Sequence, residues 1–379
     1  MSVELLRYLW IDSLCIVQDD EADWREEAAK MSSYYSQAYI TLAATMSNNA
    51  DGGLFQWPKD IVLNDGSQTW CVRAMRHLQR ATTSTAPLFQ RGWIFQERLL
   101  SPRVLHFATY ELCFECNAQN TCECKQDMPD QGWQIKQEYL NGPSWKNTDP
   151  TVADIWHRMV EAYCKLSLTK PADKLPALSG LADQMRSRRG SNYFAGLWDD
   201  TLLDDILWSV STLDDKRAPK LVPWRAPSWS WASVADSIRY GLYPRLDEVY
   251  CTVMDVHCSW IGPSTTGELR TGHIILHGPT FQGAVRDGRN LYGDPETKKP
   301  VSGYFSPDYQ LELGVMPVVL LRIAREKRML GREYLLVLKK VDENRTEFER
   351  VGLFEFFPLG SRWNELDWER AGKQTIKII

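Results

Sequence analysis

The sequence predicts an α/β domain with a parallel sheet and helices, followed by a helical region and a β-rich C-terminal region. Near the N-terminus, two short apolar runs flank one amphipathic helix, which is the pattern of a βαβ unit. Between residues 151 and 210, apolar residues recur at helical spacing. From residue 248 onward, apolar runs alternate with turn-rich gaps, as in a small sandwich or barrel.

Composition limits the classes of function that fit the chain. Of its 379 residues, 44% are hydrophobic, which is ample for the cores of two or three domains. The net charge of -5 means that the chain has no overall excess of positive charge, so we expect no nucleic-acid partner. No run approaches the ~20 apolar residues of a membrane span. Nine unevenly spread cysteines predict reduced thiols and hence a cytoplasmic protein.

The βαβ unit begins with a predicted strand over residues 8–12. A helix capped by Asp20 follows, and residues 39–44 form the next predicted strand. The two strands should be parallel neighbours, which places Asp12 at the carboxyl end of the first one, where ligands bind in such sheets. Asp12 could equally cap the turn that comes after it.

Residues 91–107 are the most informative stretch of the chain. They predict a short helix with Trp93 and Phe95 inward, a break at Ser101-Pro102 and a strand over 104–107. Glu97 follows Trp93 by four residues and shares its face, where a carboxylate needs a partner such as Arg91 or Arg98. Two interpretations remain open: an ordinary ion pair on a half-exposed helix, or a functional carboxylate.

Four cysteines come next, in the pattern C-x2-C-x5-C-x-C. Such spacing would allow zinc, but residues three apart on a strand point to opposite faces, so we predict structural thiols and no metal. The four residues are Cys113, Cys116, Cys122 and Cys124. Nearby, His106 could act as a base for a cysteine, although a core histidine with its hydrogen bonds satisfied is the favoured interpretation.

The remaining chain divides by composition. We predict a domain over residues 1–125, a linker over 126–150, a mainly helical region over 151–247 and a β-rich region over 248–379. The helical region should contain helices over 151–166, from 173 onward and over 202–210, and a strand over 227–234. Gly180 would weaken its helix by ~1 kcal/mol relative to alanine unless close packing requires it.

Several of these segments resemble the fungal heterokaryon incompatibility (HET) domain. The resemblance rests on the core Arg91-Gly92-Trp93 and Gln96-Glu97 with its following apolar strand, on the run from Leu9 to Asp20, and on Gly52-Gly53-Leu54-Phe55. It implies self/non-self recognition and programmed cell death when incompatible fungal cells fuse. It also implies protein partners and a homo-oligomer on activation.

One departure from the family pattern concerns the start of the domain. HET domains usually begin with a further strand and helix before the Trp-Ile-Asp run, whereas seven residues precede Tyr8 here. We expect either a shortened domain or an incomplete start, with a sheet edge left exposed unless a partner covers it.

HET domains are also suspected relatives of TIR domains, some of which cleave NAD, so the resemblance implies a TIR-like parallel sheet. The spacing of Trp93 and Glu97 resembles the segment that holds the catalytic glutamate of those enzymes. This implies Glu97 as catalytic carboxylate, and Asp12, Gln18, Trp93 and Arg91 as ligand contacts. NAD would be a substrate, and no cofactor is expected. The alternatives are a non-catalytic interaction module and an inactive or repurposed paralogue.

Overall fold

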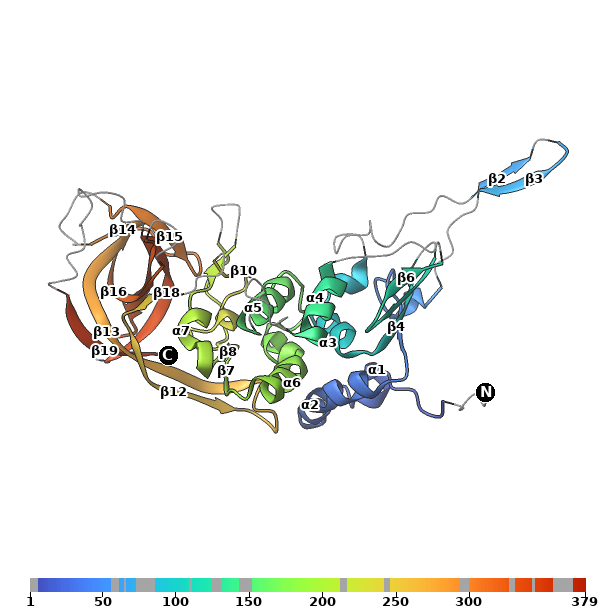
Figure 1. Ribbon diagram of the computed structural model, residues 1–379, viewed down its shortest axis with the longest axis horizontal. Helices are drawn as coiled ribbons and strands as arrows, with labels where there is room; N and C mark the ends of the chain where they lie inside the picture. The colour runs from blue at the N-terminus through green and yellow to red at the C-terminus, as the bar shows by residue number, and fades with distance from the viewer. Residues whose placement is uncertain are drawn as a thin grey trace.

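The computed structural model describes residues 6–55, 61–64, 66–72, 86–108, 111–123, 131–142, 152–211, 217–241, 246–293, 300–326, 331–342, 345–356 and 371–379. Three parts follow one another along the long axis of the molecule: an N-terminal sheet with helices, a helical middle and a C-terminal barrel (Figure 1). No helix among the described residues is long and apolar enough to cross a membrane.

The N-terminal sheet has four strands in the order β1-β4-β5-β6. They are β1 (Thr41–Ala43), β4 (Arg103–Phe107), β5 (Leu112–Cys116) and β6 (Asn120–Cys122). β1 and β4 are parallel, whereas the other two pairings are antiparallel. The sheet is therefore mixed, and the prediction of a parallel sheet holds for one pair of strands. A separate hairpin joins β2 (Ile61–Asn64) to β3 (Thr69–Val72).

The predicted strand over residues 8–12 is wrong. Residues 6–11 have no regular structure, and Asp12–Cys15 forms the short helix α1. Tyr8 is 95% exposed, and no described strand pairs with this segment, so its apolar residues lack the neighbour that a strand needs. The helix α2 (Glu21–Gln37) is confirmed, with Asp20 accepting from the backbone N–H groups of Ala22 and Asp23 at 2.8 and 3.2 Å.

The central helix and its break are confirmed. The turn η3 (Pro87–Gln90) leads into α3 (Gly92–Leu100), and the chain then turns at Ser101 into β4. Four of its apolar side chains are buried: Ile94, Phe95, Leu99 and Leu100. The helix thus lies with its apolar side in the core, as its periodicity predicts.

The helical middle is built from α4 (Gln131–Asn141), α5 (Val152–Tyr163), α6 (Ser179–Arg189) and α7 (Leu202–Asp205). Two 3-10 turns, η4 (Pro171–Lys174) and η5 (Pro176–Leu178), precede α6, and the hairpin of β7 (Tyr193–Phe194) and β8 (Leu197–Trp198) follows it. The turn η6 (Asp199–Thr201) leads into α7, and β9 (Ser209–Val210) pairs with β10 (Ile238–Arg239). α4 lies inside the predicted linker and buries Ile135 and Tyr139.

Two predictions for this middle part are wrong. The helix predicted over residues 202–210 ends at Asp205. Residues 227–234 form no strand: η7 (Trp231–Ser233) follows Ser230, whose hydroxyl accepts from the backbone N–H of Ala232. The alternation of residue types predicted a strand with both indoles on one buried face. Trp229 and Trp231 are both fully buried, but they lie in a turn inside the core and not on a strand.

The β-rich part contains a closed barrel. Its strands are β13 (Leu269–Arg286), β16 (Val315–Arg325), β17 (Glu333–Lys340), β18 (Glu347–Phe356) and β19 (Gly372–Ile378). The long strand β13 pairs with both β19 and β16, and this double pairing closes the ring. Four shorter or outer strands complete the sheet: β11 (Glu248–Val249), β12 (Thr252–Trp260), β14 (Asn290–Tyr292) and β15 (Gly303–Pro307). The prediction of a small sandwich or barrel is thus confirmed as a barrel.

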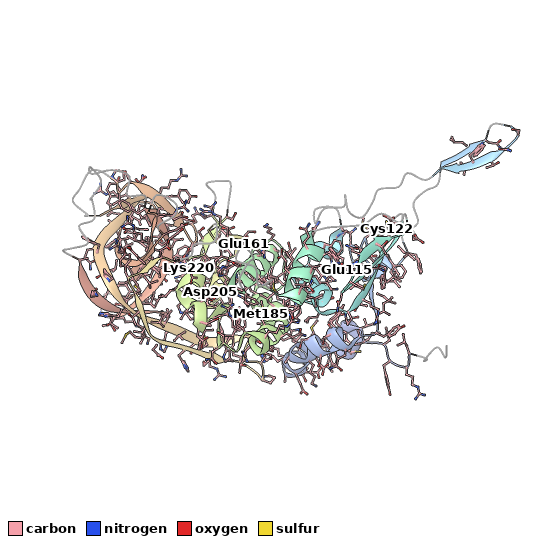
Figure 2. The ribbon with its side chains drawn as sticks, viewed as in Figure 1. Glu115, Cys122, Glu161, Met185, Asp205 and Lys220 are labelled. Atoms are coloured by element: carbon pink, nitrogen blue, oxygen red, sulfur yellow. The ribbon has the colours of Figure 1, made fainter. Side chains whose placement is uncertain are left out.

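One buried apolar cluster links the three parts. It begins with Phe95 and Leu99 in α3, continues through Trp156 and Trp231, and ends at Ile378 in β19. Side chains fill the helical middle between the N-terminal sheet and the barrel, where Met185 and Asp205 lie (Figure 2). This core extends across the boundaries predicted between domains. The boundaries therefore remain predictions.

Candidate functional site

Glu97 occupies a contact between two helices. Its side chain projects from α3 toward α2 and is half-buried. Burial raises the pKa of its carboxyl to about 7, while a hydrogen bond from Tyr35 and the charge of Arg91 act in the opposite direction. At neutral pH, Glu97 is therefore present in both protonation states and could donate or accept a proton.

Tyr35 is the direct partner of Glu97. Burial raises the pKa of the Tyr35 phenol far above its usual range, and the charge of Glu97 raises it further, so the phenol stays protonated and donates to the carboxylate. Trp10 packs on the same helix, with ring centroids 5.7 Å from Tyr35 and 5.1 Å from Tyr34. The irregular N-terminal segment thus lies against the helix that holds the partner of Glu97.

The structure brings together some of the predicted site residues. Arg91 and Asp12 are both exposed, and both lie close enough to Glu97 for their charges to act on its pKa, Arg91 lowering it and Asp12 raising it. Of the two arginines considered as partners, Arg91 is the one that acts on Glu97. These three residues form the candidate site together with Tyr35.

Gln18 and Trp93 have structural contacts instead. The Gln18 amide donates to the backbone carbonyls of Ile16 at 2.9 Å and Asp12 at 3.3 Å, so it holds its own loop. The Trp93 indole N–H donates to Asp173 Oδ2 at 3.0 Å. Its ring also meets Trp24 edge-on, with centroids 6.2 Å apart. Among the described residues, no hydrogen bond joins either side chain to Glu97.

Sequence reasoning missed Tyr35. The helical spacing of Trp24, Ala28, Met31 and Tyr35 marks it as part of an apolar face, which is correct for its ring. A buried tyrosine hydroxyl usually finds a hydrogen-bond partner, and that rule is the signal that could have pointed to a polar group opposite it. The rule does not say which residue supplies that group, because the partner comes from another helix.

Arg98 belongs to a second buried polar cluster, centred on Glu115 (Figure 2). Glu115 is fully buried and accepts from Arg98 Nε at 2.8 Å and from Lys136 Nζ at 3.1 Å. Burial alone would raise the pKa of Glu115, but Arg98, then His106 and Lys136, outweigh it and hold the pKa well below its usual range. All of these groups face one another inside the protein, so the cluster is structural.

His106 is a core histidine, as the favoured interpretation predicts. Its Nδ1 lies 3.1 Å from Thr45 Oγ1, and its Nε2 lies 3.5 Å from Glu115 Oε2. The core position is thus confirmed, but the prediction of satisfied hydrogen bonds holds for Nδ1 only, because Nε2 makes no hydrogen bond in the described part of the chain.

The cysteines of the C-x2-C-x5-C-x-C segment differ from one another. Cys113 and Cys116 form no disulfide, whereas Cys122 takes part in one, so the prediction of reduced thiols is wrong for Cys122. Cys124 lies outside the described residues. Across the described parts of the chain, no three His, Cys, Asp or Glu side chains are grouped so that they could hold a metal ion.

The N-terminal part is thus an α/β unit in which a helix-borne carboxylate of raised pKa faces a tyrosine from a second helix. Residues 2–97 match the family model described as heterokaryon incompatibility protein (HET). This part of the chain is a HET domain region, and the resemblance drawn from its motifs is confirmed. The match includes Asp12, Gln18, Arg91, Trp93 and Glu97. No curated protein and no solved structure matches the chain.

Proposed function

We propose that this protein acts in fungal self/non-self recognition and programmed cell death, and that it signals by self-association in the cytoplasm. The observation that carries the proposal is the HET family match over residues 2–97. Its partners would be other protein molecules, including further copies of the chain.

The N-terminal sheet has a feature that supports self-association. Among the described residues, β1 pairs only with β4, so the opposite side of β1 is an open edge. Leu42 on β1 is 48% exposed, and Tyr39 just before it is 64% exposed. An exposed strand edge with apolar side chains is a ready template for pairing with a second chain.

The test is the oligomeric state of the purified protein. Leu42→Lys places a charge on the open edge and should abolish concentration-dependent association in sedimentation velocity. Leu313→Lys is the matched control, because Leu313 is 86% exposed in the β-rich part and lies away from this edge. In fungal cells, the first variant should lose killing activity and the second should keep it. Unchanged association of Leu42→Lys would refute the role of β1.

A second candidate function is cleavage of NAD, with Glu97 as the catalytic carboxylate. The observation that favours it is the pKa of about 7, which leaves Glu97 in equilibrium between its acid and its carboxylate at neutral pH. In this reaction the bond between ribose C1′ and the nicotinamide nitrogen breaks, and its electron pair leaves with nicotinamide. Ionised Glu97 would stabilise the oxocarbenium-like ribose and take a proton from the attacking water, which gives ADP-ribose.

NAD consumption by the concentrated parent protein and by Glu97→Gln separates the two candidates. Turnover by the parent that the variant lacks would support catalysis, and the rate should rise with pH through about 7 because ionised Glu97 is the active form. Glu312→Gln, at an exposed carboxylate in the β-rich part, is the control. Absence of turnover by the assembled parent would exclude this chemistry and leave the interaction module.

A further inference from the structure

A second candidate site lies in the helical middle, outside the HET match. A cavity of about 620 Å³ is lined by residues of α5, by residues from Asp199 to Leu207, and by residues between Tyr240 and Val253. Its volume falls within the range of small-molecule sites. The apolar part of its lining, called the apolar wall below, includes Leu202, Leu203, Leu207, Leu246, Val249 and Val253.

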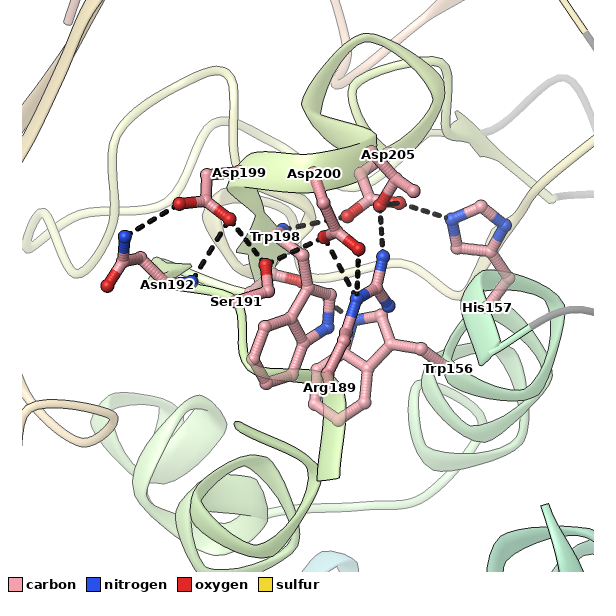
Figure 3. Close-up of polar contacts among 11 residues, drawn as sticks. Trp156, His157, Arg189, Ser191, Asn192, Trp198, Asp199, Asp200 and Asp205 are labelled. Atoms are coloured by element: carbon pink, nitrogen blue, oxygen red, sulfur yellow. Dashed lines mark hydrogen bonds and ion pairs between the residues drawn. The ribbon is translucent and has the colours of Figure 1, made fainter. Parts of the chain in front are cut away.

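His157 stands at the polar side of this cavity with a fixed orientation (Figure 3). The residue is 8% exposed, and its ring stacks on Tyr240 with centroids 3.7 Å apart and an interplanar angle of 11°. His157 Nε2 lies 2.7 Å from Asp205 Oδ1. Asp205 also accepts from the Thr201 hydroxyl at 3.0 Å and the Trp198 backbone N–H at 2.8 Å.

These contacts fix the tautomer of His157. Because the Asp205 carboxylate only accepts hydrogen bonds, Nε2 must carry a proton. The other nitrogen, Nδ1, makes no hydrogen bond to any residue that the structure describes. In the neutral ring this nitrogen is an acceptor, so it needs a donor from outside.

The cation that borders the cavity already has partners (Figure 3). Arg189 Nε donates to both carboxylate oxygens of Asp200 at 2.9 Å, and its Nη2 donates to Thr201. Asp199 accepts from Ser191 and Asn192. Two of the three Arg189 nitrogens are therefore engaged within the protein, and the third, Nη1, is buried without a hydrogen-bond partner in the described part of the chain.

Asp204 differs from these residues. Its half-buried side chain lines the cavity and has no hydrogen-bond or ion-pair partner among the described residues. Burial and, to a smaller extent, the charge of Asp205 raise the pKa of Asp204 to about 6, although His157 acts in the opposite direction. The carboxylate is thus short of a compensating positive charge.

We propose that this cavity binds a small primary amine with an apolar body. The ammonium group would donate to the Asp204 carboxylate and to His157 Nδ1, neither of which has a hydrogen-bond partner among the described residues, and the body would lie against the apolar wall. Among the described residues that line the cavity, the carboxylates of Asp199, Asp200 and Asp204 outnumber the one Lys or Arg side chain, which is that of Arg189. This charge balance favours a cation over an anion.

Three probes with one common body test the head group: 4-phenylbutylamine, 4-phenylbutanol and 4-phenylbutyrate. Calorimetric titration of the full chain at pH 7.5 should show one saturable site for the amine. A charge-assisted hydrogen bond contributes about 1.5–3 kcal/mol, so the amine should bind roughly ten to a hundred times more tightly than the alcohol. The carboxylate probe should bind most weakly.

Two variants locate the binding. Asp204→Asn should weaken the amine roughly tenfold or more and leave the alcohol unchanged, whereas Asp19→Asn, the same change at an exposed aspartate of the N-terminal part, should change neither. Val249→Trp fills the apolar side from a position that is 49% exposed, so it should weaken all three probes without disturbing the core. Thermal unfolding of each variant shows whether it is folded.

Three results would overturn the proposal. They are no heat of binding for the amine at millimolar concentration, tighter binding of 4-phenylbutyrate than of the amine, and unchanged amine affinity in folded Asp204→Asn. None of these readouts depends on Glu97, on NAD or on self-association, so this proposal and the proposed function fail or succeed separately.

Discussion

At the scale of single residues, Glu97 couples the stability of the fold to pH. Its folded pKa of about 7 lies above the ~4.3 of an unfolded chain, so the folded state holds the proton more tightly. Protonation therefore stabilises the fold. This contribution is complete below about pH 4 and is lost as the pH rises through 7.

Glu97→Gln should remove this pH dependence. The amide cannot ionise, but its oxygen can still accept from Tyr35. We expect parent and variant to have similar free energies of unfolding at pH 5, and the variant to be more stable at pH 8 by at most about 3 kcal/mol. Urea unfolding at both pH values measures this, with Glu312→Gln as control. If the free energies of unfolding of parent and Glu97→Gln changed with pH in the same way, the raised pKa of Glu97 would be contradicted.

Glu115 presents the opposite case, because its charge is compensated on several sides. Glu115→Gln would leave Arg98 and Lys136 as buried cations without their carboxylate. We expect a loss of about 3–5 kcal/mol in the free energy of unfolding at pH 7, measured in urea. A loss below 1 kcal/mol would mean that water reaches the cluster.

The sequence predicted part of this residue-scale picture. The spacing of Trp93 and Glu97 identified a carboxylate on a largely buried face, and Arg91 was among the partners considered for it. Tyr35 and Lys136 could not be predicted, because each reaches its carboxylate from a different helix. Side-chain partners of this kind depend on tertiary packing, which periodicity alone does not specify.

At the scale of elements, α6 packs closely against α2 and α3 through Gly180. A Cβ at this position would collide with the side chain of Ser32 and come within 2.9 Å of Gln96 Oε1. The Gly180 backbone N–H also donates to that same oxygen at 2.7 Å. The sequence allowed a glycine in this helix if close packing required it, and the packing does so.

Gly180→Ala should therefore destabilise the protein although alanine is the better helix former. Overpacking of this kind costs about 1–3 kcal/mol, which exceeds the ~1 kcal/mol gained in helix propensity. Ser187→Ala, at an exposed position of the same helix, is the control and should be neutral or slightly stabilising. Denaturant unfolding of both variants decides, and a stabilised Gly180→Ala would show that the helices move apart freely.

Elements with local signals were the ones that sequence analysis located. α2 has a capping aspartate and an apolar face, and β16, β17 and β18 are apolar runs between turns. The strand over residues 8–12 failed because a strand exists only when another strand pairs with it. The short β19 carries no such local signal, because its apolar content is low, and its pairing with β13 is the reason it is a strand.

At the scale of the whole molecule, the three-part organisation was predictable, and the continuity of its core was not. The main buried cluster includes Leu99 in the HET region and Ile378 in the barrel. Contacts between residues so far apart in the chain leave no local trace in the sequence. Because the parts share this core, we expect them to unfold together.

Leu99→Ala tests this cooperativity. Leu99 is almost fully buried, and truncation of a buried leucine costs about 2–5 kcal/mol. Tryptophan fluorescence and far-UV circular dichroism should report one common midpoint in the parent, and the variant should shift both by the same amount. Separate midpoints, or a shift in one signal alone, would show that the HET region and the barrel unfold independently.

The position of β19 affects how the chain can fold during synthesis. β19 lies between β13 and β18 and completes the ring, yet it comes after the other described strands of the barrel in translation order. The barrel therefore cannot close on the ribosome until residue 378 has left the exit tunnel. Until then, the apolar edges of β13 and β18 are available to chaperones or to neighbouring nascent chains. The HET region is synthesised first, but the core that it shares with the barrel is complete only after β19 has been synthesised.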